Sequence, residues 1–187
     1  MSEQQPETFR NQFLIALPTL ESDYFHNSVS LIIDHNTEGA FGLMINRQVD
    51  VTLAELFPDM ADQDFTHANC PVLEGGPVQQ DRVFFLHDAS REYQSTFKVS
   101  DEIYLSTSMD LLEDISKGSG PARILALLGY AGWGEGQLEH ELGENVWLLS
   151  PASARIVFDV PYQDRPSEAA GLLGVDLNLI STSAGHG

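Results

Sequence analysis

The chain has 187 residues and is 42% apolar, which is enough to bury one core and too short for two full domains, so we expect a single domain spanning residues 1–187. Nine Lys and Arg residues stand against 28 Asp and Glu residues, which gives a formal net charge of -19. The basic residues are scattered with no two adjacent, which disfavours direct binding to nucleic acid or anionic lipid, since clustered cations hold both.

The first elements are predicted from apolar runs and the residues that interrupt them. Residues 1–8 are polar, and we expect a flexible N-terminal tail. Residues 9–16 (FRNQFLIA) indicate a strand that ends before a proline, which cannot donate a ladder hydrogen bond. Residues 29–34 and 39–46 indicate a β-hairpin joined by a short Asn- and Gly-containing turn, and Phe25 just before it is expected to pack back onto the core.

Two short helices are predicted from capping signals. The sequence TLAE that begins at Thr52 is typical of a capping box, and it predicts a helix that runs to about Phe57 and stops at the following proline. Ser108 is expected to cap a second helix over residues 109–117, and Gly118 is expected to end it.

The remaining elements are predicted from short apolar runs and breaker residues. Further strands are expected at residues 71–73, 82–87, 97–99, 103–106, 122–130, 146–149 and 175–180. Further helices are expected at residues 137–142, at 151–157 with Pro151 in the first position, and at 165–173. The run 122–130 is apolar throughout, which favours a central strand buried on both faces. Strict strand–helix alternation is missing, so the pattern predicts an α+β fold and disfavours a doubly wound one.

Cysteine usage and the first residues both favour the cytoplasm. Cys70 is the single cysteine, so no intramolecular disulfide can form. The first ten residues carry acids where a secretion signal carries positive charge, and no apolar segment is long enough to anchor the chain in a membrane. Cys70 precedes a proline, and we interpret it as a small buried apolar side chain, with a reactive thiol as the alternative.

Residues 127–142 (LLGYAGWGEGQLEHEL) concentrate four glycines and three glutamates in one stretch, and two interpretations stay open. In the first, the glycines let a ligand approach, Trp133 offers a flat face, and Gln137 and Glu139 offer directed hydrogen bonds. In the second, the glycines supply a bend and three apolar side chains close one end of the core: Tyr130, Trp133 and Leu138.

Several specific chemistries are disfavoured because their key residues are missing. No glycine cluster ends in the Gly-Lys-Ser/Thr of a phosphate loop, and Glu139 stands where a dinucleotide fingerprint needs its third glycine or alanine. The run DHNTEG begins like a calcium loop, but Ile45 occupies the place of the closing glutamate. HExxH, paired CxxC and GxSxG motifs are absent, and the internal histidines are dispersed. We therefore expect no metal and no cofactor.

Four motifs follow one another along most of the chain: FLIALP at 13–18, DHNTEGAFGLMINR at 34–47, GGPV at 75–78 with LH at 86–87, and LGYAGWGEGQLE at 128–139 with Trp147 beyond. Together they resemble the YqgE/AlgH family of bacterial proteins. The resemblance implies an α+β fold with a mixed, largely antiparallel sheet, and a cytosolic protein of a family commonly labelled as transcriptional regulators. It carries over no catalytic residues. Its motif residues are candidates for one shared surface: His35, Asn36, Asn46, Gly75, Gly76, Pro77, His87, Trp133, Gln137 and Glu139.

Three functional hypotheses follow. The first is a regulatory protein that acts through a protein partner or a small effector, without direct DNA binding. The second is an enzyme or small-molecule binder with a polar cleft near residues 132–139 and His35 or His87 as its acid–base group. The third is a structural or assembly module in which the Trp133 surface is filled by another chain or by the protein's own core. The sequence does not choose an oligomeric state.

Overall fold

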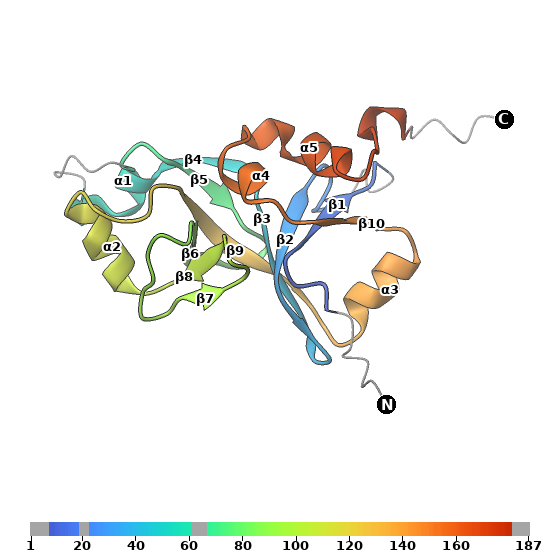
Figure 1. Cartoon of the computed structure of the whole chain (residues 1–187), viewed down its shortest axis with the longest axis horizontal. Coiled ribbons are helices and arrows are strands. Elements are labelled where there is room, and N and C mark those ends of the chain that lie inside the picture. Colours follow the sequence, from blue (N-terminus) through green and yellow to red (C-terminus); the bar gives the residue numbers. More distant parts are fainter. Residues whose placement is uncertain (1–7, 19–22, 61–66, 181–187) are drawn as a thin grey trace.

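The computed structural model describes residues 8–18, 23–60 and 67–180, in which ten strands form one sheet with short helices around it (Figure 1). The strands are β1 (Gln12–Ala16), β2 (Val29–Asn36), β3 (Gly39–Met44), β4 (Gln48–Thr52), β5 (Pro71–Glu74), β6 (Val78–His87), β7 (Phe97–Lys98), β8 (Tyr104–Ser106), β9 (Ile124–Trp133) and β10 (Trp147–Pro151). The helices are α1 (Leu53–Leu56), α2 (Met109–Ser116), α3 (Gln137–Gly143), α4 (Ala154–Phe158) and α5 (Arg165–Gly171). Short 3-10 turns occur at Pro58–Met60, Tyr162–Asp164 and Leu177–Leu179.

The central strand of the sheet is β9, which runs diagonally through the middle of the molecule (Figure 1). Along one edge it pairs with β6, and along the other it pairs first with β5 and then with β3. The full order is β10-β1-β2-β3-β9-β6-β8-β7, with β4 attached to β5. Only the β5–β9 pair is parallel among the described strands, so the expected α+β fold with a mixed, largely antiparallel sheet is confirmed.

Side chains alternate between the two faces of the sheet and build separate parts of the core. On β1, Phe13 and Ile15 join the largest cluster, which α4 and α5 cover, while Leu14 joins a second cluster with Trp133 and Leu138 of the α3 end. A third cluster lies under α1 and α2. Figure 1 shows α2 and α3 at opposite ends of the molecule, so the two smaller clusters are well separated.

Most of the predicted elements are confirmed. The hairpin forms between β2 and β3, and the β7–β8 hairpin forms as expected. Thr52 and Glu55 make both hydrogen bonds of the capping box at the start of α1. Phe25 packs back onto the core between the rings of Trp133 and Trp147. The predicted tail, residues 1–8, lies outside the described residues except for Thr8.

Three local predictions are corrected. The helix expected from Pro151 begins later, because Pro151 ends strand β10 and it is Ser153 whose hydroxyl accepts the Ile156 N–H at the start of α4. Ser108 occupies the N-cap position of α2, but its hydroxyl donates to the Asp110 carboxylate and makes no capping bond to the helix backbone. Residues 175–180 were expected to form a strand, but they contain a 3-10 turn at Leu177–Leu179. The Asp176 carboxylate accepts the Asn178 N–H at the start of this turn.

The glycine-rich stretch also divides differently from the expectation. Strand β9 continues through Gly129 and Gly132 to Trp133, so the bend follows Trp133, at Gly134–Gly136. Gly129 adopts a left-handed backbone (φ +74°) and does not end the strand, because β3 provides new pairing beyond it. No helix among the described residues has the length and apolar character needed to cross a bilayer.

Candidate functional site

The end of the β2–β3 hairpin meets helix α3, and a bulge in β2 makes this contact. The β2–β3 register shifts between Ile32 and Asp34, which turns His35 onto the face that Ile32 occupies. There the His35 Nε2 atom hydrogen-bonds to the Glu139 carboxylate of α3. We call His35, Asn36, Trp133 and Glu139, with the hollow beside them, the hairpin site; it unites candidates from two sequence motifs.

Both ring nitrogens of His35 are engaged. Its Nδ1 atom accepts the Phe9 N–H at 3.0 Å, so the proton of the neutral ring sits on Nε2 and is donated to Glu139. The Phe9 ring stacks on the imidazole with centroids 4.8 Å apart, and the His35 side chain is only 5% exposed. No ring nitrogen of His35 is left to take a proton from a substrate while Phe9 and Glu139 stay in place.

A hollow of about 240 Å³ lies beside this contact. Two of its carboxylates, on Asp34 and Glu38, have no cationic partner among the described residues. Two aromatic side chains also line it. The full lining is Asp34, Asn36, Glu38, Gly39, Ala40, Phe41 and Trp133.

Helix α3 presents its exposed polar residues next to this hollow. Gln137 accepts the Gly134 N–H at 3.0 Å and donates to Glu141 at 3.2 Å, so its amide stabilises the turn into the helix. Glu139 lies in the first turn, where hydrogen bonding to its own backbone N–H and then to His35 lowers the pKa of its carboxyl. Glu139 is therefore ionised at neutral pH.

Trp133 belongs to the protein's own core. It is 5% exposed and lies in the cluster with Leu138 and Trp147. Tyr130 packs on the other large cluster, across the sheet. The interpretation in which Trp133 and Leu138 close one end of the core is confirmed, and only Tyr130 departs from it.

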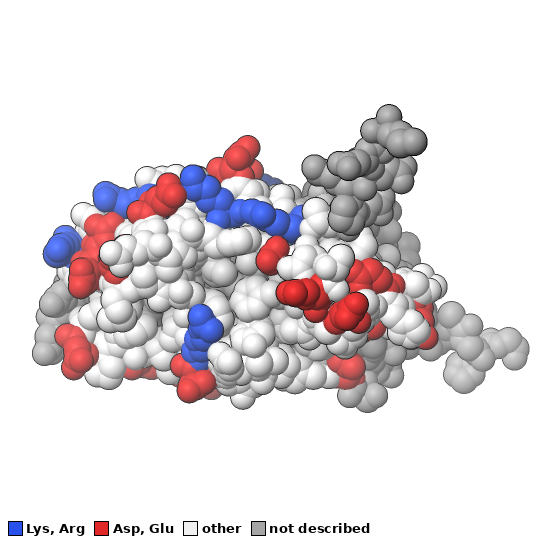
Figure 2. Space-filling view, turned by 90° about the horizontal axis from the view of Figure 1, so that it is seen from below, with Lys and Arg blue, Asp and Glu red and all other residues white. Residues whose placement is uncertain are grey.

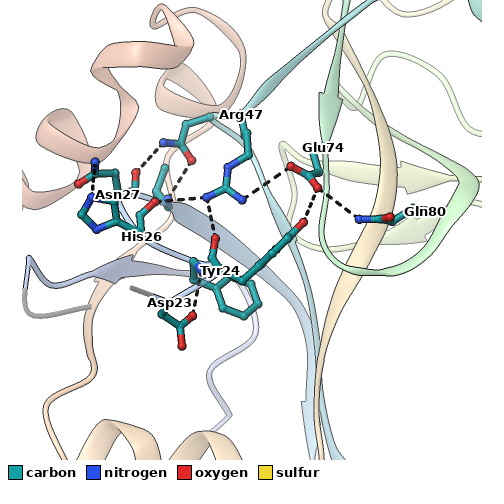
Figure 3. Close-up of polar contacts among 10 residues, drawn as sticks. Asp23, Tyr24, His26, Asn27, Arg47, Glu74 and Gln80 are labelled. Atoms are coloured by element: carbon teal, nitrogen blue, oxygen red, sulfur yellow. Dashed lines mark hydrogen bonds and ion pairs between the residues drawn. The ribbon is translucent and has the colours of Figure 1, made fainter. Parts of the chain in front are cut away.

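A second polar cluster, which we call the loop clamp, holds residues 23–27 against the sheet (Figure 3). Arg47 donates to the backbone oxygens of Tyr24 (2.8 Å) and His26 (3.2 Å), and lies 3.7 Å from the Glu74 carboxylate. The Tyr24 hydroxyl donates to Glu74 from the other side. Burial, followed by the Glu74 carboxylate, raises the pKa of Tyr24 to about 12, so this hydroxyl stays protonated as a donor.

The candidates Asn46, Gly75, Gly76 and Pro77 lie near this clamp and not at the hairpin site. Asn46 accepts the Val29 N–H at 3.0 Å and donates to the Asn27 carbonyl at 2.9 Å, so it fixes the loop. A Cβ on Gly76 would lie 2.1 Å from the Tyr130 carbonyl carbon, and one on Gly75 would lie 2.3 Å from the Gly129 oxygen. These glycines permit close contact between two segments of backbone; only Pro77 is exposed.

His87 is fully buried and lies outside both groups. Its Nδ1 donates to the Asp88 carbonyl and its Nε2 accepts the Ser106 hydroxyl, both at 2.8 Å. Ser106 in turn bonds Thr96 at 2.7 Å. Burial lowers the pKa of His87, so the ring is neutral at neutral pH and joins β6 to β8 and the loop before β7.

Cys70 is half-buried against the cluster under α1 and α2, and burial raises the pKa of its thiol. This environment favours the interpretation as an apolar side chain over a reactive thiol. No group of three or more His, Cys, Asp or Glu side chains in the described residues is arranged to hold a metal ion.

Sequence reasoning did not single out Phe9, Tyr24, Arg47 or Glu74. Each acts through a partner that is distant in the chain, such as Phe9 with His35 or Tyr24 with Glu74. Only Arg47 lay within one of the motifs, and no local pattern distinguishes it there.

The fold and these polar groups define an α+β protein with a central glycine-kinked strand and a hairpin joined to a helix by a histidine–glutamate contact. The sequence pattern of the AlgH-like family matches residues 13–178, and the chain belongs to this family. It is 46% identical over 180 residues to a UPF0301 protein of Nitrosococcus oceani, covering 95% of this chain and 96% of that one. It is 47% identical over 179 residues to a UPF0301 protein of Thioalkalivibrio sulfidiphilus, with the same coverage.

Two solved structures are similar over nearly the whole chain. The solution structure of the AlgH protein from Pseudomonas aeruginosa has a TM-score of 0.77 and 43% sequence identity, with 100% of both chains covered. The crystal structure of a Corynebacterium diphtheriae protein has a TM-score of 0.73 at 21% identity, with 97% of this chain and 95% of that chain covered. The second likeness concerns the fold alone.

Proposed function

We propose that this chain is a cytosolic regulatory protein that acts by binding a protein partner or a small effector and does not bind DNA directly. The observation that supports this proposal best is that most of the Lys and Arg side chains are already engaged within the protein. Five of the nine basic side chains pair with carboxylates: Arg47, Arg91, Lys98, Arg123 and Arg155. Arg165 is buried and donates to backbone carbonyls. Arg10 also donates to backbone carbonyls, those of Lys98 and Val99. Among the described residues, Arg82 and Lys117 therefore remain to meet a phosphate backbone.

The distribution of charge supports the same conclusion. On the face in Figure 2, basic and acidic side chains are interspersed, and acidic side chains gather towards the end that carries α3. A DNA-binding surface needs several cations on one face, because affinity comes largely from the counterions that they displace. If members of this family regulate transcription, as their common label says, this charge distribution favours an indirect role without DNA contact.

The hairpin site is the surface that we assign to the effector or partner. It combines a hollow, two carboxylates that have no cationic partner among the described residues, and an exposed amide on Asn36. These groups lie where two distant segments of the chain meet. Binding there would act on α3 and on the N-terminal segment together, since His35 touches both.

The absence of direct DNA binding is tested by fluorescence anisotropy with a pool of linear duplexes at about 0.15 M salt, where non-specific binders have Kd values of roughly 10⁻⁴ to 10⁻⁶ M. We expect no saturable binding below that range. Tight, sequence-selective binding that weakens in an Arg82→Ala, Lys117→Ala variant would contradict the proposal.

The effector site is tested by a thermal-shift screen of metabolites. Compounds that stabilise the wild-type protein are expected to lose their effect in Asn36→Ala and Glu38→Gln variants. Glu113→Gln serves as the matched control, because Glu113 is an exposed glutamate of α2, at the opposite end of the molecule. A stabilising compound that is unaffected by both hairpin-site changes binds elsewhere, and this outcome would remove the hairpin site from the proposal.

The two alternatives are less well supported. An enzyme using His35 or His87 as a general base needs a ring nitrogen free to face a substrate, and all four nitrogens are engaged. A module that assembles with another chain through Trp133 needs that ring exposed, and the ring is buried. This burial agrees with the other version of the third hypothesis, in which the protein's own core fills the Trp133 surface.

A further inference from the structure

His35 connects the N-terminal segment to the hairpin by several contacts, one of which depends on which ring nitrogen carries a proton. Phe9 donates its N–H to Nδ1 and stacks on the ring, and the Thr8 hydroxyl donates to the His35 carbonyl at 3.3 Å. Beyond these, Phe9 packs on the cluster that contains Trp133. Of these contacts, the hydrogen bond from the Phe9 N–H is the one that needs a lone pair on Nδ1.

A second proton on the ring can go only to Nδ1, because Nε2 already carries the first. Protonated Nδ1 becomes a donor and faces the Phe9 N–H, another donor, so this hydrogen bond is lost. One charged group, the Glu139 carboxylate of α3, bonds Nε2 and compensates the new charge. The carboxylate of Asp34, on the same strand, accepts the backbone N–H of His35 at 3.0 Å. On the other sides the ring meets no charge from Phe9 or from Ala40, its β3 neighbour.

We propose that His35 is a proton-sensitive latch: the neutral ring holds Thr8 and Phe9 on the hairpin site, and the protonated ring releases them while keeping α3 bound through Glu139. Release would uncover the side of the hairpin site that Phe9 packs against, so an effector or partner gains access when the ring is protonated. This last step rests on the proposed function, whereas the latch itself does not.

The latch is tested by NMR on the full chain between about pH 7.5 and pH 5.5, the range in which histidine commonly changes charge. The Nδ1 chemical shift of His35 reports its protonation, and hydrogen exchange of the Phe9 amide, corrected for the intrinsic effect of pH, reports release. We expect Phe9 protection to fall by about tenfold or more as Nδ1 gains its proton. The Asn11 amide, bound to the Ile32 carbonyl, is the internal control and should change by less than about twofold.

A His35→Asn variant sharpens the test, because its amide oxygen offers an acceptor near the Nδ1 position that cannot be protonated. In this variant Phe9 protection should be the same at both pH values. If Nδ1 of the wild-type protein gains a proton while Phe9 stays protected, or if the variant loses protection just as the wild type does, the latch is refuted. Neither result depends on DNA or on an effector, so the latch and the proposed function fail separately.

Discussion

At the scale of single residues, contact between backbones explains three glycines of the family motifs: Gly39, Gly75 and Gly76. Gly75 and Gly76 lie directly on the Gly129–Tyr130 segment of β9, and Gly39 would place a Cβ 2.2 Å from the Trp133 oxygen. By contrast, a Cβ on Gly132 would make only an ordinary contact, 3.6 Å from the Tyr130 ring. Glycines that look alike in the sequence therefore differ in whether a side chain can replace the hydrogen.

Gly76→Ala should lower the free energy of unfolding by about 2 kcal/mol or more, because the backbone of β9 or of the Gly75–Pro77 turn must move. Gly132→Ala is the matched control and should stay within about 0.5 kcal/mol of wild type, since Gly132 is exposed and its Cβ has room. Urea denaturation of both variants measures the difference. Equal effects of the two substitutions would show that the close backbone contact at Gly76 does not determine the free energy of unfolding.

His87 predicts a pH dependence of stability. Burial keeps its ring neutral in the folded protein, whereas the unfolded chain takes up a proton below its ordinary pKa of about 6.5. The unfolded state then binds more protons, so stability falls as the pH drops from about 6.5 towards the lowered folded pKa. Urea unfolding at several pH values should show a shallower acid loss in His87→Gln, even though that variant is less stable at pH 7. If the free energy of unfolding depends on pH equally in His87→Gln and in the wild-type protein, His87 is not the source of the acid loss.

At the scale of elements, the start of helix α4 rests on one side chain. Ser153 accepts the Ile156 N–H, and Ile156 and Val157 of this helix are fully buried in the largest cluster. Ser153→Ala should therefore cost about 1 kcal/mol of stability, the usual effect of losing an N-cap. Ser119→Ala is the control, because Ser119 is exposed and its hydroxyl makes no hydrogen bond to the described residues. If the Tm falls equally in both variants, Ser153 does not stabilise the start of α4.

Local sequence patterns predicted correctly those elements whose stabilising contacts are made by residues close in the sequence. The capping box of α1 and the β2–β3 hairpin depend on neighbouring residues, and both formed as expected. Local reasoning failed where a distant strand decided the outcome. Glycines suggested that β9 ends near Tyr130, but pairing of Ala40 with Trp133 extends it. The alternating residues 175–180 pair with no strand in the described part of the chain, and Leu177–Leu179 form a 3-10 turn.

The candidate site was predicted in part, for the same reason. Motif membership pointed to His35 and Glu139, whose contact spans 104 positions of the chain. It could not reveal the bulge that turns His35 towards α3, or the role of Phe9. It also grouped His87 with surface residues, because a buried and an exposed histidine look the same in sequence.

At the scale of the whole molecule, the net charge of -19 is the dominant feature. Carboxylates outnumber cations by 28 to nine, so most of them have no partner and repel one another. The folded state tolerates this repulsion because the two faces of the sheet bury three apolar clusters.

Added salt should therefore stabilise the protein. Raising NaCl from about 0.02 M to 0.3 M shortens the screening length to well below about 10 Å and weakens the repulsion between surface carboxylates. The Tm is expected to rise, and to rise less in an Asp101→Asn, Glu102→Gln variant, which removes two adjacent exposed acids. A Tm that falls with added NaCl would mean that the ion pairs outweigh the repulsion.

The position of β9 in the chain also sets the order in which the protein can fold. As the ribosome releases the chain, β3, β5 and β6 each emerge with one edge that only the later β9 can fill. β1 keeps an open edge longer still, until β10 arrives. Open strand edges invite pairing between chains, so a nascent chain stalled before Ile124 exposes four such edges at once, on β1, β3, β5 and β6. Aggregation of incomplete chains is thus a hazard of this topology; completion of β9 closes three of the four edges, and β10 closes the last.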